Sequence, residues 1–233
     1  MSIITRIRKN EYFKSAIAIV LVIVVVLGFF LVLQFALHVE VPIRVVESGS
    51  MCVPYSNRCD GWSHAFSQTL HVGDIIVIQG VNPEEINSDY PNSDIIVYQN
   101  PTNPAATPIV HRVVEKYQIG DIWYFQTKGD GNGQNWPATP SVQEYDSNSL
   151  WHTGEGVSEH LVLGKVVMRI PWFGHITLFL RNNPWGLPAI VTIIIALLVI
   201  EFIFPIFKDR RKQQQQNIDN EILQENSFSL IKR

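Results

Sequence analysis

The chain has 233 residues, of which 46% are hydrophobic and 17% charged, and its formal net charge at pH 7 is −3. That length accommodates one medium-sized domain together with membrane segments. Residues 38–186 hold 8 Lys and Arg side chains against 15 Asp and Glu side chains. An acidic segment without a basic stripe argues against nucleic acid as a partner.

The first predicted element is a membrane-spanning helix at residues 15–37, which follows a cytoplasmic N-terminus at residues 1–14. These 23 residues carry no charged side chain and are rich in Ile, Val, Leu and Phe. A helix of that length crosses a hydrocarbon core of about 30 Å. The basic flank would suit a cleavable signal peptide, but the apolar part is longer than usual and no small-x-small cleavage site follows. We therefore expect a retained anchor.

A second apolar run covers residues 187–207 and holds one charged side chain, Glu201. Glu201 lies shortly before Lys208, so we expect its carboxylate to reach the membrane interface or that lysine. Four basic residues precede the first run and four follow the second, and basic residues favour the cytoplasmic side. We predict a multi-pass protein of the cell membrane, with both termini cytoplasmic, residues 38–186 outside, and a disordered tail at residues 208–233.

The external segment is predicted to be a mainly β domain with antiparallel strands, built like a small barrel. Short runs rich in Ile, Val, Tyr and Phe alternate with Gly, Pro, Asn and Asp. A turn of helix is expected at residues 83–86. The expected strands are Ile43–Val46, Asp74–Gln79, Asp94–Gln99, Ile109–Tyr117, Ile122–Thr127 and Leu161–Ile170.

Both cysteines of the chain, Cys52 and Cys59, fall in this external segment. An oxidising compartment favours a disulfide that closes a short loop. His64 and His71 follow, which raises a zinc site as the alternative. The spacings match no standard zinc pattern, so we favour the disulfide and expect neither metal nor cofactor.

Three polar motifs in the external segment offer chemistry. Ser48, Gly49 and Ser50 form a turn in which small side chains let a substrate backbone approach. A serine hydroxyl needs a neighbouring base to act as a nucleophile. Asp130, in a glycine-rich loop, is a carboxylate that can orient an imidazole. The external histidines from which a base can come are His38, His64, His71, His111, His152, His160 and His175.

The order of the motifs closely resembles type I signal peptidases of the archaeal and endoplasmic-reticulum branch, in which histidine stands where bacterial enzymes use lysine. Ser-Gly-Ser-Met at residues 48–51 follows the first anchor. Gly-Asp-Ile-Ile-Val (73–77), His-Arg-Val (111–113), Thr-Lys-Gly-Asp (127–130) and Gly-Lys-Val-Val (164–167) come next in that order. The resemblance runs from the first apolar run to the second.

The resemblance implies a membrane serine endopeptidase that removes signal peptides from secretory preproteins after small residues. Ser50 matches the nucleophile, His111 the general base and Asp130 the first acid of the family. The backbone N–H of Ser50 and the Ser48 hydroxyl match the donors that stabilise the oxyanion. Lys128 is interpreted as a loop-stabilising residue, because a lysine needs strong desolvation to act as a base.

The chain departs from the family pattern in two places. The usual Ser-Met-x-Pro is one residue longer here, since residues 50–54 read Ser-Met-Cys-Val-Pro. A second acid usually follows Lys-Gly-Asp by about six residues, and Trp136 occupies that position. Either Asp146 or Asp130 therefore completes the triad. The alternatives for the whole protein are a catalytically inactive membrane scaffold of the same fold and a two-anchor β-domain receptor. Besides preproteins, the expected partners are membrane lipid and secretion machinery.

Overall fold

The computed structural model describes residues 11–54, 59, 68–100, 103, 105–146, 148–151 and 154–201. The chain divides into two units, residues 1–178 and 179–233, and each is described by itself. The predicted tail at residues 208–233, most of the predicted N-terminal segment, and the candidate histidines His64 and His152 lie outside the described residues.

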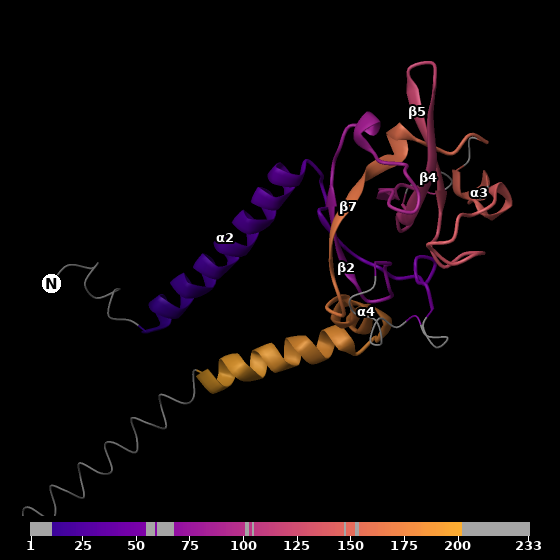
Figure 1. The fold of residues 1–233 in the computed structure, drawn as a ribbon. Coiled ribbons are helices and arrows are strands. Elements are labelled where there is room, and N and C mark those ends of the chain that lie inside the picture. The colour runs from indigo at the N-terminus through magenta and orange to yellow at the C-terminus, as the bar shows by residue number, and fades with distance from the viewer. Residues whose placement is uncertain are drawn as a thin grey trace, which may run out of the picture. The chain divides into compact units, whose positions relative to one another are not determined.

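The first unit begins with helix α2, Glu11–Leu37, which covers the predicted apolar segment (Figure 1). Its stretch from Ile17 to Leu37 is long and apolar enough to cross a membrane. Most side chains along that stretch are exposed and apolar on every side of the helix. A helix that is apolar all round needs apolar surroundings, which a lipid bilayer supplies.

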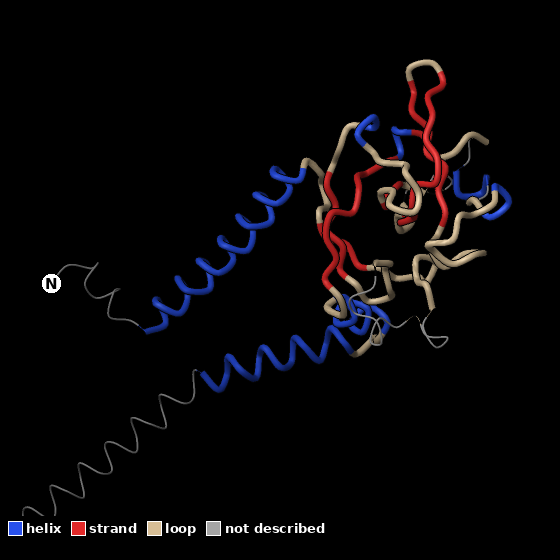
Figure 2. The backbone as a smooth tube through the Cα atoms, in the orientation of Figure 1, coloured by secondary structure: helices blue, strands red, loops and turns tan. Residues whose placement is uncertain are grey.

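The rest of the first unit is built on one seven-stranded sheet in the order β1-β2-β7-β3-β4-β5-β6, in which every pairing is antiparallel. Figure 2 shows the strands curling around the interior of the domain. The expected mainly β, antiparallel fold is confirmed. The strands are β1 (Ile43–Val45), β2 (Ile75–Gln79), β3 (Ile95–Tyr98), β4 (Ile109–Ile119), β5 (Ile122–Lys128), β6 (Val157–Ser158) and β7 (Val162–Ile170).

Short helical turns connect the strands. The turn expected near Pro83 is present as the 3-10 helix η1, because proline is pre-set for the first position of a helix. An α-helix near the end of the domain was not expected from the sequence. Among the described residues between β2 and Asn182, the helical elements are η1 (Pro83–Glu85), η2 (Val142–Glu144), α3 (Asn148–Trp151), η3 (Glu159–Leu161) and α4 (Gly174–Asn182).

Two hydrophobic clusters lie on the two faces of the central strand β3. Successive side chains of a strand point to opposite faces, so Ile96 and Tyr98 enter one cluster and Val97 enters the other. The first cluster also holds Phe125 and Trp151. The second holds Val46 and Met51, which flank the Ser-Gly-Ser turn. Both ends of that turn are therefore anchored in a packed core.

The second unit contains a helix at Gly186–Glu201, where the second membrane span was predicted. It meets the length and composition criterion for a span only together with α4, from which a sharp bend separates it. Residues 202–207 of the predicted span lie outside the described residues.

Candidate active site

The Ser-Gly-Ser turn leaves the sheet directly after β1. The backbone N–H of Cys52 donates to the carbonyl of Gly49 at 2.9 Å, which closes the turn around Ser50. Met51 and Cys52 are buried, while Ser50 is partly exposed. Cys52 forms a disulfide with Cys59. The nucleophile candidate is thus held on a short, closed loop.

His111 lies on β4, opposite Ile96 of β3, and only 4% of its surface is exposed. Its Nε2 atom is 3.0 Å from the Ser50 Oγ atom. Its Nδ1 atom is 2.5 Å from Oδ2 of Asp146. The structure therefore brings three of the predicted site residues, Ser50, His111 and Asp146, into one row of hydrogen bonds. Such a row can pass a proton from the serine to the imidazole while the carboxylate orients the ring.

Asp146 follows η2, in a loop that returns to β5. The backbone N–H of Asp146 donates to the Thr127 carbonyl at 2.8 Å. The Thr127 hydroxyl donates to Oδ2 of Asp146 at 2.7 Å. These contacts attach the loop to the sheet beside His111. Thr127 opens the Thr-Lys-Gly-Asp motif, but neither the motif nor the spacing of the residues indicated that it contacts Asp146.

Asp130, the other candidate acid, is paired with Arg112 instead of His111. Nε and Nη2 of Arg112 donate to the two carboxylate oxygens of Asp130, each at 2.8 Å. Both side chains are buried. Burial raises the pKa of Asp130, and the hydrogen bonds from Arg112 act in the opposite direction. Asp130 is thus part of a buried ion pair.

The two acids lie on different faces of the sheet because His111 and Arg112 are neighbours on one strand. Adjacent side chains of a strand point to opposite faces. Thr127 lies opposite Val113, two residues after His111, so it shares the His111 face. Lys128 lies opposite Arg112 and shares that face. Asp146 thus contacts the His111 face of the β4–β5 pair, and Asp130 contacts the Arg112 face.

Trp136, which stands at the family's usual acid position, packs on the Arg112 face. Its ring lies 5.3 Å from the Arg112 guanidinium carbon. Its indole N–H donates to the Pro91 carbonyl at 2.9 Å. A guanidinium over an indole face is a favourable cation–π contact. Trp136 therefore covers the Arg112–Asp130 pair.

Lys128 is buried, and its amine donates to carbonyls of the following loop. The acceptors are Gly129 at 3.2 Å and Gln134 at 2.7 Å. Burial lowers the pKa of Lys128, while the negative charges of Asp130, Glu144 and Asp146 oppose that effect. These contacts agree with its interpretation as a loop-stabilising residue.

That loop packs directly on the nucleophile turn, and two of its glycines make this close approach feasible. The backbone N–H of Gly131 donates to the Ser50 carbonyl at 2.9 Å. A Cβ atom on Gly131 would lie 2.1 Å from the Cys52 carbonyl oxygen, and one on Gly129 would lie 2.5 Å from the Ser50 carbonyl oxygen. Neither position has room for a side chain.

A cavity of about 420 Å³ opens at the site. Ser48, Ser50 and His111 line it, together with Asn132 and Leu150. The Ser48 hydroxyl oxygen lies 3.2 Å from the Ser50 hydroxyl oxygen, at the edge of the cavity. A second cavity, of about 260 Å³, shares part of this lining, namely Val45, Glu47, Thr107, Pro108 and Val110.

Comparison with known proteins shows which family the chain belongs to. No family model matches the chain. A signal peptidase complex catalytic subunit SEC11 from Metarhizium acridum is 32% identical over 163 residues, which cover 68% of this chain and 74% of that protein. The subunits of the same name from Fusarium vanettenii (31%, 68% and 74%) and Pyricularia oryzae (29%, 69% and 76%) are also similar.

The chain belongs to the family of SEC11 signal peptidase catalytic subunits. The resemblance to the endoplasmic-reticulum branch of type I signal peptidases is thereby confirmed, as is the expectation of an enzyme of the hydrolase class. In this signal peptidase family member, the usual position of the second acid holds Trp136, and an acid from a later loop, Asp146, meets the histidine.

Proposed function

We propose that this chain is a membrane-anchored serine endopeptidase that removes signal peptides from preproteins. In this proposal Ser50 is the nucleophile, His111 the general base and Asp146 the acid of the triad. The observation that carries the proposal is the continuous row Ser50 Oγ, His111 Nε2, His111 Nδ1 and Asp146 Oδ2, with separations of 3.0 and 2.5 Å at its two hydrogen bonds.

The proposed reaction begins when the Ser50 oxygen attacks the carbonyl carbon of the scissile peptide bond. His111 Nε2 takes the serine proton as the new C–O bond forms. The oxyanion receives hydrogen bonds from the Ser50 backbone N–H and the Ser48 hydroxyl. Collapse breaks the C–N bond, and His111 gives its proton to the leaving amine. Water then attacks the acyl carbonyl while His111 takes a proton from it, and collapse breaks the ester C–O bond as His111 returns that proton to the Ser50 oxygen.

The two adjoining cavities support a substrate that binds in an extended form. β1 ends the sheet and pairs with β2 alone among the described strands, so its outer edge is free to pair with a peptide. Alternate side chains of an extended peptide point the same way. The residues before the cut would then enter the cavities at Val45, Pro108 and Val110, and we expect small side chains there.

The test is cleavage of a labelled preprotein by the full-length protein in detergent, assayed both purified and in membranes, because the relatives are named as subunits of a complex. We expect wild type to cut after a small residue. Ser50→Ala, His111→Ala and Asp146→Asn should each abolish most of the activity. Asp89→Asn removes an exposed carboxylate and serves as the matched control. Cleavage by Ser50→Ala would refute the assignment of the nucleophile.

The proposed base also predicts a pH dependence. A histidine accepts the serine proton only when its ring is neutral, so protonation of the ring removes the base. We therefore expect kcat/KM to fall as the solution is acidified. A profile that stays flat into clearly acidic solution would exclude His111 as the base.

A further inference from the structure

Thr127 makes two hydrogen bonds to Asp146, whereas a residue that only fills space in the core needs none. Its side chain is fully buried on β5, and its hydroxyl is 2.7 Å from Oδ2 of Asp146, the oxygen that also faces His111. Its backbone carbonyl accepts the N–H of the same aspartate. Two contacts from one threonine therefore determine where this carboxylate sits.

The direction of the hydroxyl hydrogen follows from the neighbours of Thr127. The indole Nε1 of Trp151 lies 2.9 Å from the Thr127 Oγ1 atom, and an indole N–H can only donate. Thr127 must accept that bond with a lone pair. Its own hydrogen is then available for Asp146, which accepts it at Oδ2.

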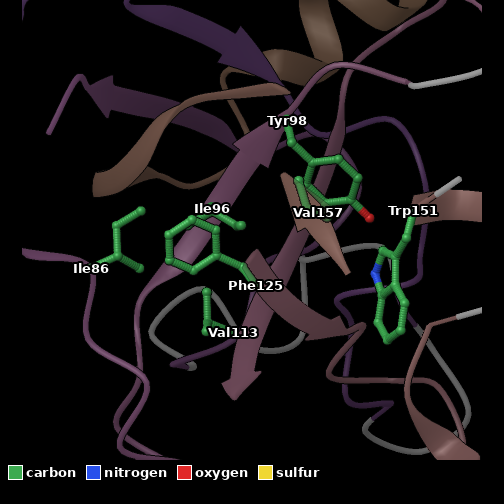
Figure 3. Close-up of a cluster of buried hydrophobic side chains, with 7 residues drawn as sticks. All are labelled: Ile86, Ile96, Tyr98, Val113, Phe125, Trp151 and Val157. Carbon is green, nitrogen blue, oxygen red and sulfur yellow. The ribbon is translucent and has the colours of Figure 1, made fainter. Parts of the chain in front are cut away.

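Tyr98 is the third neighbour of the Thr127 hydroxyl. Its hydroxyl lies 3.5 Å from the Thr127 Oγ1 atom. Burial, and then the negative charge of Asp146, raises the pKa of Tyr98, so its hydroxyl keeps its proton. Figure 3 shows the Tyr98 hydroxyl and the Trp151 indole nitrogen facing the same space in the buried cluster. Once the Thr127 hydrogen is given to Asp146, Tyr98 can meet the Thr127 oxygen only as a donor.

We propose that Thr127, oriented by Trp151, is a positioning residue that holds Oδ2 of Asp146 against Nδ1 of His111. The inference rests on the proposed triad. A carboxylate held only by its backbone can rotate and lose the imidazole, whereas a second hydrogen bond to the same oxygen stops this rotation. Trp151 lies on α3, five residues after Asp146. One stretch of chain therefore supplies both Asp146 and the indole that orients Thr127.

The experiment measures kcat and KM of the purified full-length protein with Thr127→Val, Thr127→Ser and Trp151→Phe. Thr127→Val removes the hydroxyl at nearly constant volume. A hydrogen bond to a charged group corresponds to a rate factor of about tenfold to a hundredfold, so we expect kcat to fall by that amount with KM little changed. Thr127→Ser should recover most of the rate. Trp123→Phe is the matched control for Trp151→Phe, because it removes an indole elsewhere in the same cluster.

Double variants separate positioning from general support of the fold. A hydroxyl that acts through Asp146 has no further effect once Asp146 is Asn, so Thr127→Val should not lower the residual rate of Asp146→Asn. Likewise, Trp151→Phe combined with Thr127→Val should be no slower than Thr127→Val. If Thr127→Val is too unstable to purify, Trp151→Phe alone and in the Asp146→Asn background carries the test.

Three outcomes would overturn the inference: an unchanged kcat in Thr127→Val, a serine variant as slow as the valine variant, or losses that multiply in the Asp146→Asn background. Full activity of Asp146→Asn itself would refute the proposed triad. The two failures are therefore distinguishable, because Asp146→Asn tests the acid and the Thr127 variants test what holds it.

Discussion

Two buried aspartates near Ser50 have different partners. We therefore expect one to support mainly the free energy of unfolding and the other mainly the cleavage rate. Asp130 neutralises Arg112, and both side chains are removed from water. Asp146 faces His111. Removing one member of a buried ion pair leaves the other charge uncompensated, at a cost of about 3–5 kcal/mol. Removing the acid that orients a catalytic imidazole costs mainly rate.

We therefore predict that Asp130→Asn and Asp146→Asn differ in opposite ways in stability and in cleavage rate. Asp130→Asn should lower the free energy of unfolding by about 3–5 kcal/mol while the folded protein still cleaves preprotein. Asp146→Asn should unfold near the wild-type midpoint but lose about 10⁴-fold in kcat. Denaturant unfolding and cleavage rates in the same detergent check both. Replacing Arg112 by Met together with Asp130→Leu should recover stability, since no charge is then left alone.

The opposite pattern would exchange the roles of the two acids. A folded Asp130→Asn variant without activity, beside an active Asp146→Asn, would make Asp130 the acid of the triad.

At this scale the sequence named the candidate residues that the structure brings together, but not all of their contacts. Ser50 and His111 stand in motifs that are recognisable in order. Asp146 was one of two open choices, because a loop of unpredictable path brings it back to β5. The alternation of His111 and Arg112 implies one acid for each face of the sheet, but only the structure assigns them.

Thr127 and Trp151 meet through tertiary packing, for which the sequence carries no local signal.

At the scale of elements, the nucleophile turn is held from three directions. β1 and the buried Met51 hold its two ends. The loop at residues 129–131 packs on its backbone, where Gly131 bonds the Ser50 carbonyl. The Cys52–Cys59 disulfide closes the segment that follows. Because Cys52 is two residues after Ser50, movement of this segment also moves Ser50, the proposed nucleophile.

The disulfide is accordingly predicted to support both stability and rate. Cys52→Ala with Cys59→Ala opens a loop with a sequence separation of 7. The chain-entropy estimate for so short a loop is about 2–3 kcal/mol. We expect unfolding at lower denaturant concentration and a lower kcat. Treating wild type with a dithiol reductant should reproduce both effects.

The double alanine variant is its own control for the reductant, because it has no disulfide to reduce and should not respond. If wild type keeps its full rate after complete reduction, then β1 with Met51 and the loop at residues 129–131 are sufficient to hold the Ser50 turn.

The elements themselves were largely predictable, since the strands carry runs of β-branched and aromatic residues between turn residues. All six expected strands are present, with ends shifted by a few residues. β6 was missed because two residues, Val157 and Ser158, are too few for any periodic pattern. α4 was missed because it has only 9 residues and begins at Gly174, a residue of low helix propensity.

For the whole molecule, the proposed function depends on where the two apolar segments place the active site. A signal peptide crosses the membrane, so the site that cuts it must lie on the far side from the cytoplasm. The first segment forms a helix long enough to span. The basic residues outside both segments predict that both termini are cytoplasmic and that residues 38–186 are outside. The second segment decides whether the chain crosses the membrane once or twice.

Cysteine labelling tests that arrangement without background, because the chain has two cysteines and both form the disulfide. We predict that Asp121→Cys, exposed in the β4–β5 turn, reacts with a membrane-impermeant maleimide in intact spheroplasts. Ser2→Cys and Ser227→Cys should react only after permeabilisation, because two crossings return the chain to the cytoplasm. Reaction of Ser227→Cys in intact spheroplasts would mean that α2 is the single anchor and that the C-terminal segment stays outside.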